Sequence, residues 1–326
     1  MRRLALALTL VSCAPRLPPE PAGELVNGGR APLRGVVAPA GLGLSARTCR
    51  DCHLEASHAW AQSRHAAAFD NAIFQASFAL EPRPWCVNCH APLPEQARGE
   101  LRAEGVSCAA CHLRDGVVLV AGLPTSSGTA AHPERQERAL TDGALCAGCH
   151  QFDFPGTHAP MQNTLAEWKA WGRGRPCVGC HSHALGGAHD EARVRGALEL
   201  SATARGDEVD VAIAVRGVGH RFPSGDPFRR LVVELCQGPP ASLDEGTGGC
   251  AVESTRVLRR EVNPETGALV RDGAVPPQGL AFTLHSPAAT HFRVEYRFAA
   301  PSTEAALAPW DVAYEVARGA IDGRVK

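Results

Sequence analysis

Apolar and polar residues follow different patterns in different parts of this 326-residue chain. Near the start, Arg2 and Arg3 precede an unbroken apolar run over residues 4–11, which is too short to cross a bilayer as a helix. From about residue 197 onward, apolar residues alternate with polar ones, and this period of two is typical of half-buried strands. The alternating apolar positions are Val209, Val211, Ile213 and Val215; Phe292, Val294, Tyr296 and Phe298; and Val312, Tyr314 and Val316.

The C-terminal strands are expected to form a small β-sandwich over residues 197–326. Residues 263–267 have the composition of a tight turn, so they predict a hairpin between two strands. Several short strands with turn signals and no helical pattern favour a sandwich. His285 and His291 fall in the last strands, where we expect solvated positions. This region shows no recognisable catalytic set, so we expect it either to cap the preceding region or to present His220 to that region and dock a partner.

Before residue 197 the clearest helical spacing joins Leu54, His58, Ala61, His65 and Phe69. It predicts one helix that carries both histidines on one face.

Five CxxCH motifs lie between residues 47 and 190. They are Cys49-Arg-Asp-Cys52-His53, Cys86-Val-Asn-Cys89-His90, Cys108-Ala-Ala-Cys111-His112, Cys146-Ala-Gly-Cys149-His150 and Cys177-Val-Gly-Cys180-His181. This pattern is the signature of covalent haem attachment. Two thiols three positions apart can form thioethers with the vinyl groups of one porphyrin, and the following histidine becomes the proximal iron ligand. The sequence therefore predicts five covalently bound haem c groups.

Structural zinc sites and disulfides are the competing interpretations of paired cysteines. Neither requires a histidine directly after every pair. With 14 histidines in 326 residues, five such coincidences have a probability on the order of 10⁻⁷. We therefore favour haem attachment over both alternatives.

The haems also change the expected source of the hydrophobic core. Aromatic residues make up only 5% of the chain, and roughly 28 residues per haem are too few to build a core of side chains. Porphyrins packed this densely must be close neighbours. We predict an α + β chain of two domains: a mainly helical or irregular pentahaem cytochrome c domain over residues 47–196, followed by the β-sandwich.

Each iron needs a sixth ligand, and histidine is the default because Met161 is the only internal methionine. Bis-histidine ligation gives lower potentials than His–Met ligation. Nine histidines remain after the proximal ones, so some of them are not ligands. The nine are His58, His65, His132, His158, His183, His189, His220, His285 and His291.

Several local patterns resemble multihaem cytochromes c of the hydroxylamine-oxidoreductase type, a group that includes small tetrahaem electron carriers. The resemblance covers about residues 47–235 and rests on the haem motifs together with residues 60–66, 105–112, 146–152, 160–168, 187–190 and 219–223. It implies closely packed haem pairs with mostly bis-histidine ligation. It also implies that His65, His132, His189 and His220 are the leading distal candidates, followed by His158 and His183 and then by His58.

The family contains both carriers and enzymes, so the resemblance leaves the activity open. Its pentahaem nitrite reductases bind the active haem through CxxCK, whereas all five motifs here end in histidine. Its hydroxylamine oxidases use more haems and a cross-linking tyrosine. Tyr296 and Tyr314 of this chain both fall in the C-terminal strand region.

The N-terminal segment predicts export. Residues 1–12 resemble a lipoprotein signal peptide that ends before Cys13, whose sulfur would be diacylated; a plain secretory signal is the alternative. Ala14 favours the periplasmic side of the outer membrane, or the cell surface. Residues 13–46 are rich in proline and glycine and predict a tether. Outside the cytoplasm Cys236 and Cys250 are expected to form a disulfide, with free thiols as the alternative.

These features predict an electron-transfer lipoprotein whose partners are other redox proteins or a membrane electron-transfer complex. A net charge of −1 gives no indication of nucleic-acid binding. The alternative is a reductase or oxidase of a small nitrogen or sulfur oxyanion at one five-coordinate haem. No catalytic residue can be assigned from the sequence.

Overall fold

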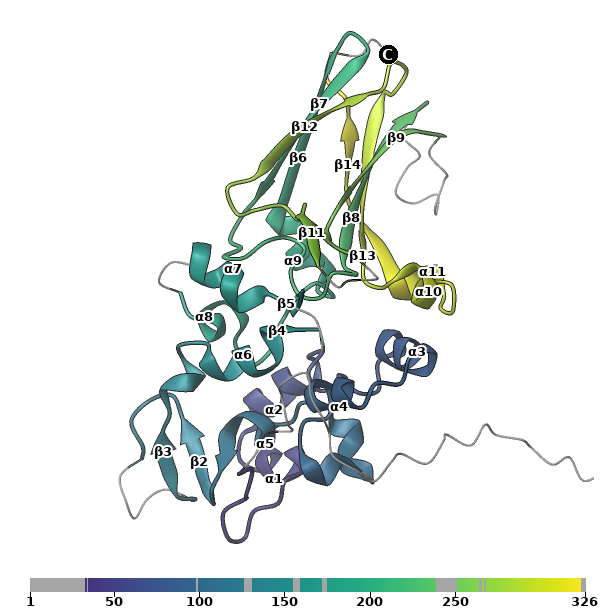
Figure 1. Ribbon diagram of the computed structural model, residues 1–326. Coiled ribbons are helices and arrows are strands. Elements are labelled where there is room, and N and C mark those ends of the chain that lie inside the picture. The colour runs from purple at the N-terminus through teal and green to yellow at the C-terminus, as the bar shows by residue number, and fades with distance from the viewer. Residues whose placement is uncertain are drawn as a thin grey trace, which may run out of the picture.

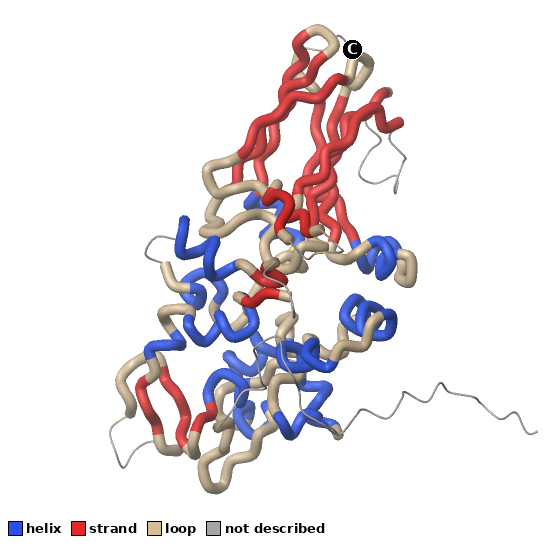
Figure 2. The backbone as a smooth tube through the Cα atoms, viewed as in Figure 1, coloured by secondary structure: helices blue, strands red, loops and turns tan. Residues whose placement is uncertain are grey.

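A computed structural model of the chain combines short helices with several β-sheets, as the sequence predicts. The structure describes residues 33, 35–97, 99–125, 131–154, 159–171, 175–238, 251–263, 266 and 268–323. Helices and the small sheet β1–β3 occupy one end of the molecule, and the longer strands occupy the other (Figures 1 and 2). The predicted signal peptide, Cys13, most of the predicted tether, His158 and Cys250 lie outside the described residues.

The helices are short throughout the described part of the chain. They are α1 (Ala46–Arg50), α2 (Leu54–Ala61), α3 (Ala72–Leu80), α4 (Pro84–His90), α5 (Cys108–His112), α6 (Ala144–His150), α7 (Thr164–Trp171), α8 (Cys177–His181), α9 (Glu191–Ala197), α10 (Pro301–Glu304) and α11 (Pro309–Val312). Short 3₁₀ helices span Pro94–Ala97, Glu100–Glu104 and Arg138–Leu140. None of the helices described is long and apolar enough to cross a membrane.

The strands of the helical part form two small sheets. These strands are β1 (Leu113–Arg114), β2 (Val117–Val120), β3 (Glu134–Gln136), β4 (Phe152–Asp153) and β5 (Pro160–Gln162). They are arranged as β1-β2-β3 and β4-β5.

The C-terminal strands form two larger sheets and a separate hairpin. These strands are β6 (Leu198–Arg205), β7 (Glu208–Val215), β8 (Arg230–Gln237), β9 (Ala251–Leu258), β10 (Arg260–Val262), β11 (Leu269–Asp272), β12 (Leu280–His285), β13 (His291–Arg297) and β14 (Ala313–Ala320). The sheet orders are β12-β7-β6 and β14-β13-β8-β9, with β10 paired to β11. All neighbouring strands within these sheets are antiparallel.

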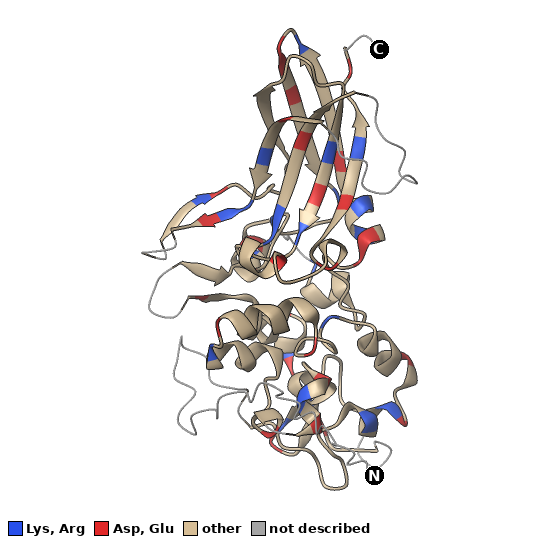
Figure 3. Cartoon of the chain, turned by 90° about the vertical axis from the view of Figure 1, so that its right-hand side faces the viewer, with Lys and Arg blue, Asp and Glu red and all other residues tan. Residues whose placement is uncertain are grey.

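The two larger sheets share one hydrophobic core. Val211 and Ile213 of β7 and Leu231 and Val233 of β8 are at most 2% exposed and belong to the same cluster. The period of two explains this burial, because every second side chain of each strand points to the same face. Along these strands, charged residues of both signs are interspersed among the others (Figure 3).

Two sequence predictions about this region need correction. The helices α10 and α11 interrupt a stretch expected to hold only strands, and each begins with a proline at its first turn. His291 was expected to be solvated but is only 3% exposed, because it lies on β13 between β8 and β14 and bonds to the Gly238 carbonyl. The predicted hairpin is present: β10 pairs with β11, and Asn263 bonds to Ala268 across the turn.

The predicted single helix over residues 54–69 is also wrong. α2 ends at Ala61, and His65 lies in the turns that follow. After Ala61, hydrogen bonds to a distant segment determine the course of the backbone. The Trp60 indole donates to the Val106 carbonyl at 2.8 Å, and the Val106 N–H donates to the His65 carbonyl at 2.9 Å. His58 and His65 therefore do not share a helix face.

Candidate haem-binding site

The five CxxCH motifs all fold as, or next to, a single helical turn. The second to fifth motifs lie in α4, α5, α6 and α8, which each end on the motif histidine. In the first motif, Cys49 lies in α1 and His53 precedes α2. Residues three and four apart share one helix face, so each turn presents two thiols and an imidazole together. None of the ten motif cysteines is in a disulfide, as thioether attachment requires.

Four of the motif histidines face a second imidazole across a gap of similar width. The ring centroids are 6.2 Å apart for His53 and His132, 6.1 Å for His150 and His65, 6.2 Å for His112 and His183, and 6.4 Å for His181 and His220. A metal–imidazole bond is about 2 Å, and a ring centroid lies about 1 Å from its nitrogen. Two nitrogens on opposite sides of one iron therefore place the centroids at about this separation.

Hydrogen bonds orient several of these rings. Nδ1 donates to a backbone carbonyl oxygen in His90 (Ala68, 2.6 Å), His112 (Leu119, 2.8 Å), His181 (Gly186, 2.7 Å) and His220 (Arg221, 2.8 Å). This bond fixes the proton on Nδ1 and leaves Nε2 as the nitrogen that can bind metal. The orientation matches what a haem iron needs from an axial histidine.

Burial favours the neutral form of several of these imidazoles, which is the form that binds metal. Burial lowers the pKa of His65, His112 and His220, and it lowers the pKa of His150 to about 3. Hydrogen bonds to backbone carbonyls oppose this effect at His112 and His220, because they favour the protonated ring.

The second motif has a different environment. His90 stacks on Phe74 with centroids 3.8 Å apart and an angle of 14° between the rings. His189, a leading distal candidate, stacks on Phe298 of the C-terminal part at 3.9 Å and 4°. Among the described residues, no imidazole faces His90 at the spacing of the other four pairs. Burial lowers the pKa of His189 to about 3, with a smaller contribution from Arg64 and Arg229.

The distal candidates derived from the sequence thus differ in whether they face a motif histidine. His65, His132, His183 and His220 each face a motif histidine, although the resemblance ranked His183 behind His189. His58 is solvent-facing and contacts Gln62, and His285 is exposed beside Glu208. His158 lies outside the described residues. No local pattern indicated Phe74 and Phe298, because their role depends on contacts between distant segments.

The motifs also lie close to one another. The thiols of Cys49 and Cys108 are within hydrogen-bonding distance, as are those of Cys146 and Cys177. Cys111 and Cys149 interact electrostatically, and so do His65 and His90. These interactions relate the first motif to the third, the third to the fourth and the fourth to the fifth. His65, which faces His150 of the fourth motif, also interacts with His90 of the second motif.

The remaining cysteine chemistry is separate from the motifs. Cys236 on β8 is disulfide-bonded, whereas its predicted partner Cys250 lies outside the described residues. Within the described ranges, no group of three or more His, Cys, Asp or Glu side chains converges as a metal site. The zinc alternative therefore has no Cys₄ cluster in this part of the chain.

Comparisons with known proteins agree with this site. Residues 48–113, which contain the first three motifs, match the family model for cytochrome c554 and c-prime. The fold is similar to the crystal structure of a penta-haem cytochrome c552 from Thermochromatium tepidum, with a TM-score of 0.66 and 20% identity. That alignment covers 85% of this chain and 98% of the other. No curated protein matches the chain.

Proposed function

We propose, from the premise that this chain is a multihaem c-type cytochrome, that it attaches five haem c groups and transfers electrons. Bound haem supplies reversible one-electron chemistry. The protein supplies the thiols, the axial imidazoles and the spacing between the sites. The proposed domains of the chain are a pentahaem domain over residues 47–196 and a β-sandwich domain over residues 197–326.

The observation that carries this proposal is the set of four facing imidazole pairs. A pair of imidazoles facing each other in this way would supply both protein ligands of a bound haem iron and would leave no position for a substrate. Burial lowers the pKa of His112, His150, His181 and His220, which favours their neutral form. Backbone carbonyls hold the rings of His112, His181 and His220. Fixed axial ligands minimise the rearrangement that accompanies a change in iron charge, which suits electron transfer.

The close contacts between motifs support a continuous route. The first motif interacts with the third, the third with the fourth, and the fourth with the fifth. His65, which faces His150 of the fourth motif, interacts with His90 of the second. Electrons would therefore pass in an order that differs from the order of the motifs in the sequence.

The cellular setting follows from the sequence. We propose an exported lipoprotein, anchored through Cys13 to the periplasmic side of the outer membrane or to the cell surface. The expected partners are other redox proteins or a membrane electron-transfer complex. Electron-transfer partners usually dock over small, weak interfaces.

The first experiment is EPR and optical spectroscopy of the purified holoprotein, with and without nitrite and hydroxylamine. A pyridine haemochrome assay gives the number of haems per chain, for which we expect five. An electron carrier shows only low-spin iron that neither molecule perturbs. A count below five, or a high-spin site that binds either molecule, contradicts the proposal in its full form.

The alternative function has one specific observation in its favour. His90 lacks the facing imidazole seen in the other four sites among the described residues, and the partly exposed Arg229 interacts electrostatically with both His90 and His189. A reductase or oxidase of a small nitrogen or sulfur oxyanion would therefore use the second haem. His189→Ala separates the two cases, because it creates a new high-spin signal only if His189 binds that iron.

A further inference from the structure

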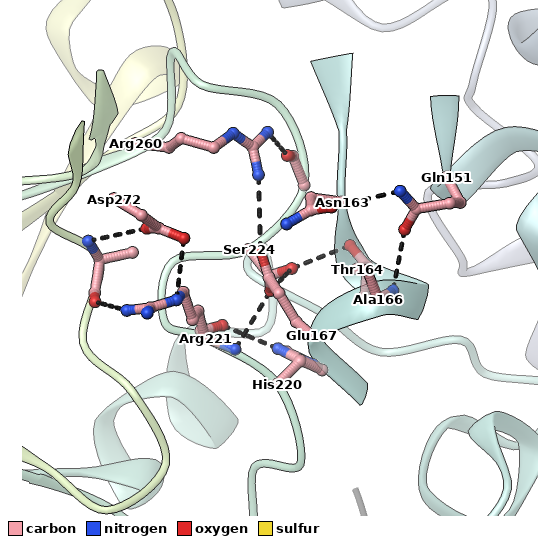
Figure 4. Close-up of polar contacts among 12 residues, drawn as sticks. Gln151, Asn163, Thr164, Ala166, Glu167, His220, Arg221, Ser224, Arg260 and Asp272 are labelled. Carbon is pink, nitrogen blue, oxygen red and sulfur yellow. Dashed lines mark hydrogen bonds and ion pairs between the residues drawn. The ribbon is translucent and has the colours of Figure 1, made fainter. Parts of the chain in front are cut away.

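A buried carboxylate from the haem-motif part of the chain contacts the loop that carries His220. This carboxylate belongs to Glu167 on α7, and the loop joins β7 to β8 (Figure 4). Glu167 is only 4% exposed. Glu167 lies within one of the patterns that carry the family resemblance, but the sequence assigned no role to it.

One oxygen of Glu167 holds the loop at two points. Oε2 accepts a hydrogen bond from the Arg221 N–H at 3.1 Å and another from the Ser224 hydroxyl at 2.7 Å. Arg221 directly follows His220, and its carbonyl accepts the Nδ1 bond of that histidine at 2.8 Å. Glu167 therefore bonds to the N–H of the same residue, Arg221, whose carbonyl orients the imidazole.

The other oxygen of Glu167 faces the β10–β11 hairpin. Oε1 lies 3.4 Å from Nη1 of Arg260, which is itself only 5% exposed. Arg260 also donates through Nη2 to the carbonyls of Met161 and Gly225, so it bridges the segment before α7 and the His220 loop.

Arg221 fixes the loop on its other side. Its Nε contacts Asp272 at 2.8 Å, and its Nη1 donates to the Ala274 carbonyl at 2.8 Å. The loop thus has anchors in α7 and in the segment at the end of β11. The His220 ring held in this way lies 6.4 Å from the His181 ring, with 13° between the planes.

We infer that Glu167 is a positioning residue for His220 and so sets how firmly that imidazole occupies the distal side of the fifth haem. The inference rests on the proposed function, because it requires His220 to be a haem ligand. Burying an ion pair costs desolvation energy that its attraction often fails to recover. A role in fixing geometry explains why the charged pair lies at the contact between the two parts of the chain.

The experiment compares Glu167→Ala with Glu167→Gln in the full-length holoprotein. Glutamine keeps an oxygen that can accept from Arg221 and Ser224, whereas alanine removes both bonds to the loop. Added imidazole is titrated against each variant, and displacement of His220 is followed by EPR and optical difference spectra. For Glu167→Ala we expect displacement at one haem at about 10- to 100-fold lower imidazole concentration. Glu167→Gln should recover most of this difference.

Glu304→Ala is the matched control. Glu304 is also largely buried and pairs with Arg230 at 2.6 Å, but it does not contact the His220 loop. It should lower thermal stability and leave the titration unchanged. The inference is overturned if Glu167→Ala titrates like the wild type, or if Glu304→Ala shifts the titration equally.

His220→Ala distinguishes failure of the inference from failure of the proposed function. If this variant converts one haem to high spin while Glu167→Ala has no effect, only the positioning role is wrong. If His220→Ala leaves all spin states unchanged, His220 is not a ligand, and the proposed coordination of the fifth haem fails as well.

Discussion

The imidazole pairs join residues that lie far apart in the sequence. His65 precedes its facing partner His150, whereas His220 follows His181. The motif histidines are recognisable because their chemistry requires adjacent thiols. Their partners have no such requirement, so a histidine that faces iron and one that faces water look alike in the sequence.

His65→Ala should convert one low-spin haem to high spin, because it removes the imidazole that faces His150. His58→Ala is a close control, since His58 is only seven positions away and contacts the exposed Gln62. It should leave the EPR spectrum unchanged. Equal spectra for the two variants would show that the 6.1 Å pair does not reflect ligation.

Sequence patterns identified the residues whose role depends on their neighbours in the sequence. They failed for residues whose position depends on contacts between distant segments. The attachment cysteines and motif histidines follow from spacing alone. His65 was identified as a distal candidate, yet it was placed on the wrong element because its position depends on Val106. Glu167 was missed because nothing near it in the sequence indicates a buried acid at an interface.

The elements of this protein differ in how far their own residues determine them. The alternating pattern of β7 and β13 predicts both their extent and their buried faces. The motif helices α4, α5, α6 and α8 span only five to seven residues, since cysteines and a histidine provide little helix-forming preference. Their ends depend on neighbours that only the folded chain brings together.

Gly105 shows how one such neighbour constrains a site. Its φ is +57°, and an added Cβ would overlap the His65 carbonyl oxygen and lie 2.9 Å from the Ala66 carbonyl oxygen. Gly105→Ala should therefore destabilise the fold by more than the roughly 1 kcal/mol expected from a positive φ alone. It should also weaken the low-spin signal of the His65 site.

Gly116→Ala provides the control for this effect. Gly116 has a similar φ of +76°, but an added Cβ would meet nothing within 4 Å. Thermal unfolding and EPR of both variants test the prediction. A larger loss of stability in Gly116→Ala would rule out the steric explanation.

At the scale of the whole molecule, the two parts of the chain depend on each other. The C-terminal part supplies His220 to face His181 and Phe298 to stack on His189. The Tyr314 hydroxyl also donates to the Ala188 carbonyl at 2.6 Å. The sequence suggested either a cap or a domain that presents His220, and the contacts add Phe298 and Tyr314 to the C-terminal residues that reach the motif-bearing part.

Leu231→Ala tests this dependence. Leu231 is completely buried between the larger sheets, so its truncation should cost about 2–5 kcal/mol. When this variant is titrated with denaturant, the His181–His220 site should lose its low-spin signal together with the sheet structure. Both changes should occur at a lower denaturant concentration than in the wild type. The other three paired sites should persist to higher concentration. Leu269→Ala, at a position that is 48% exposed, should change neither transition.

The location of His220 after all five motifs has a consequence for biogenesis. Synthesis from the N-terminus completes every attachment sequence before residue 220 exists, while His65 is present before the motif that it faces. Thioether formation at the fifth motif can therefore precede the arrival of its second axial ligand. A chain truncated after residue 196 would keep all five attachment sequences and lose the imidazole that faces His181. The fifth haem site would therefore be complete only after the loop between β7 and β8 has folded.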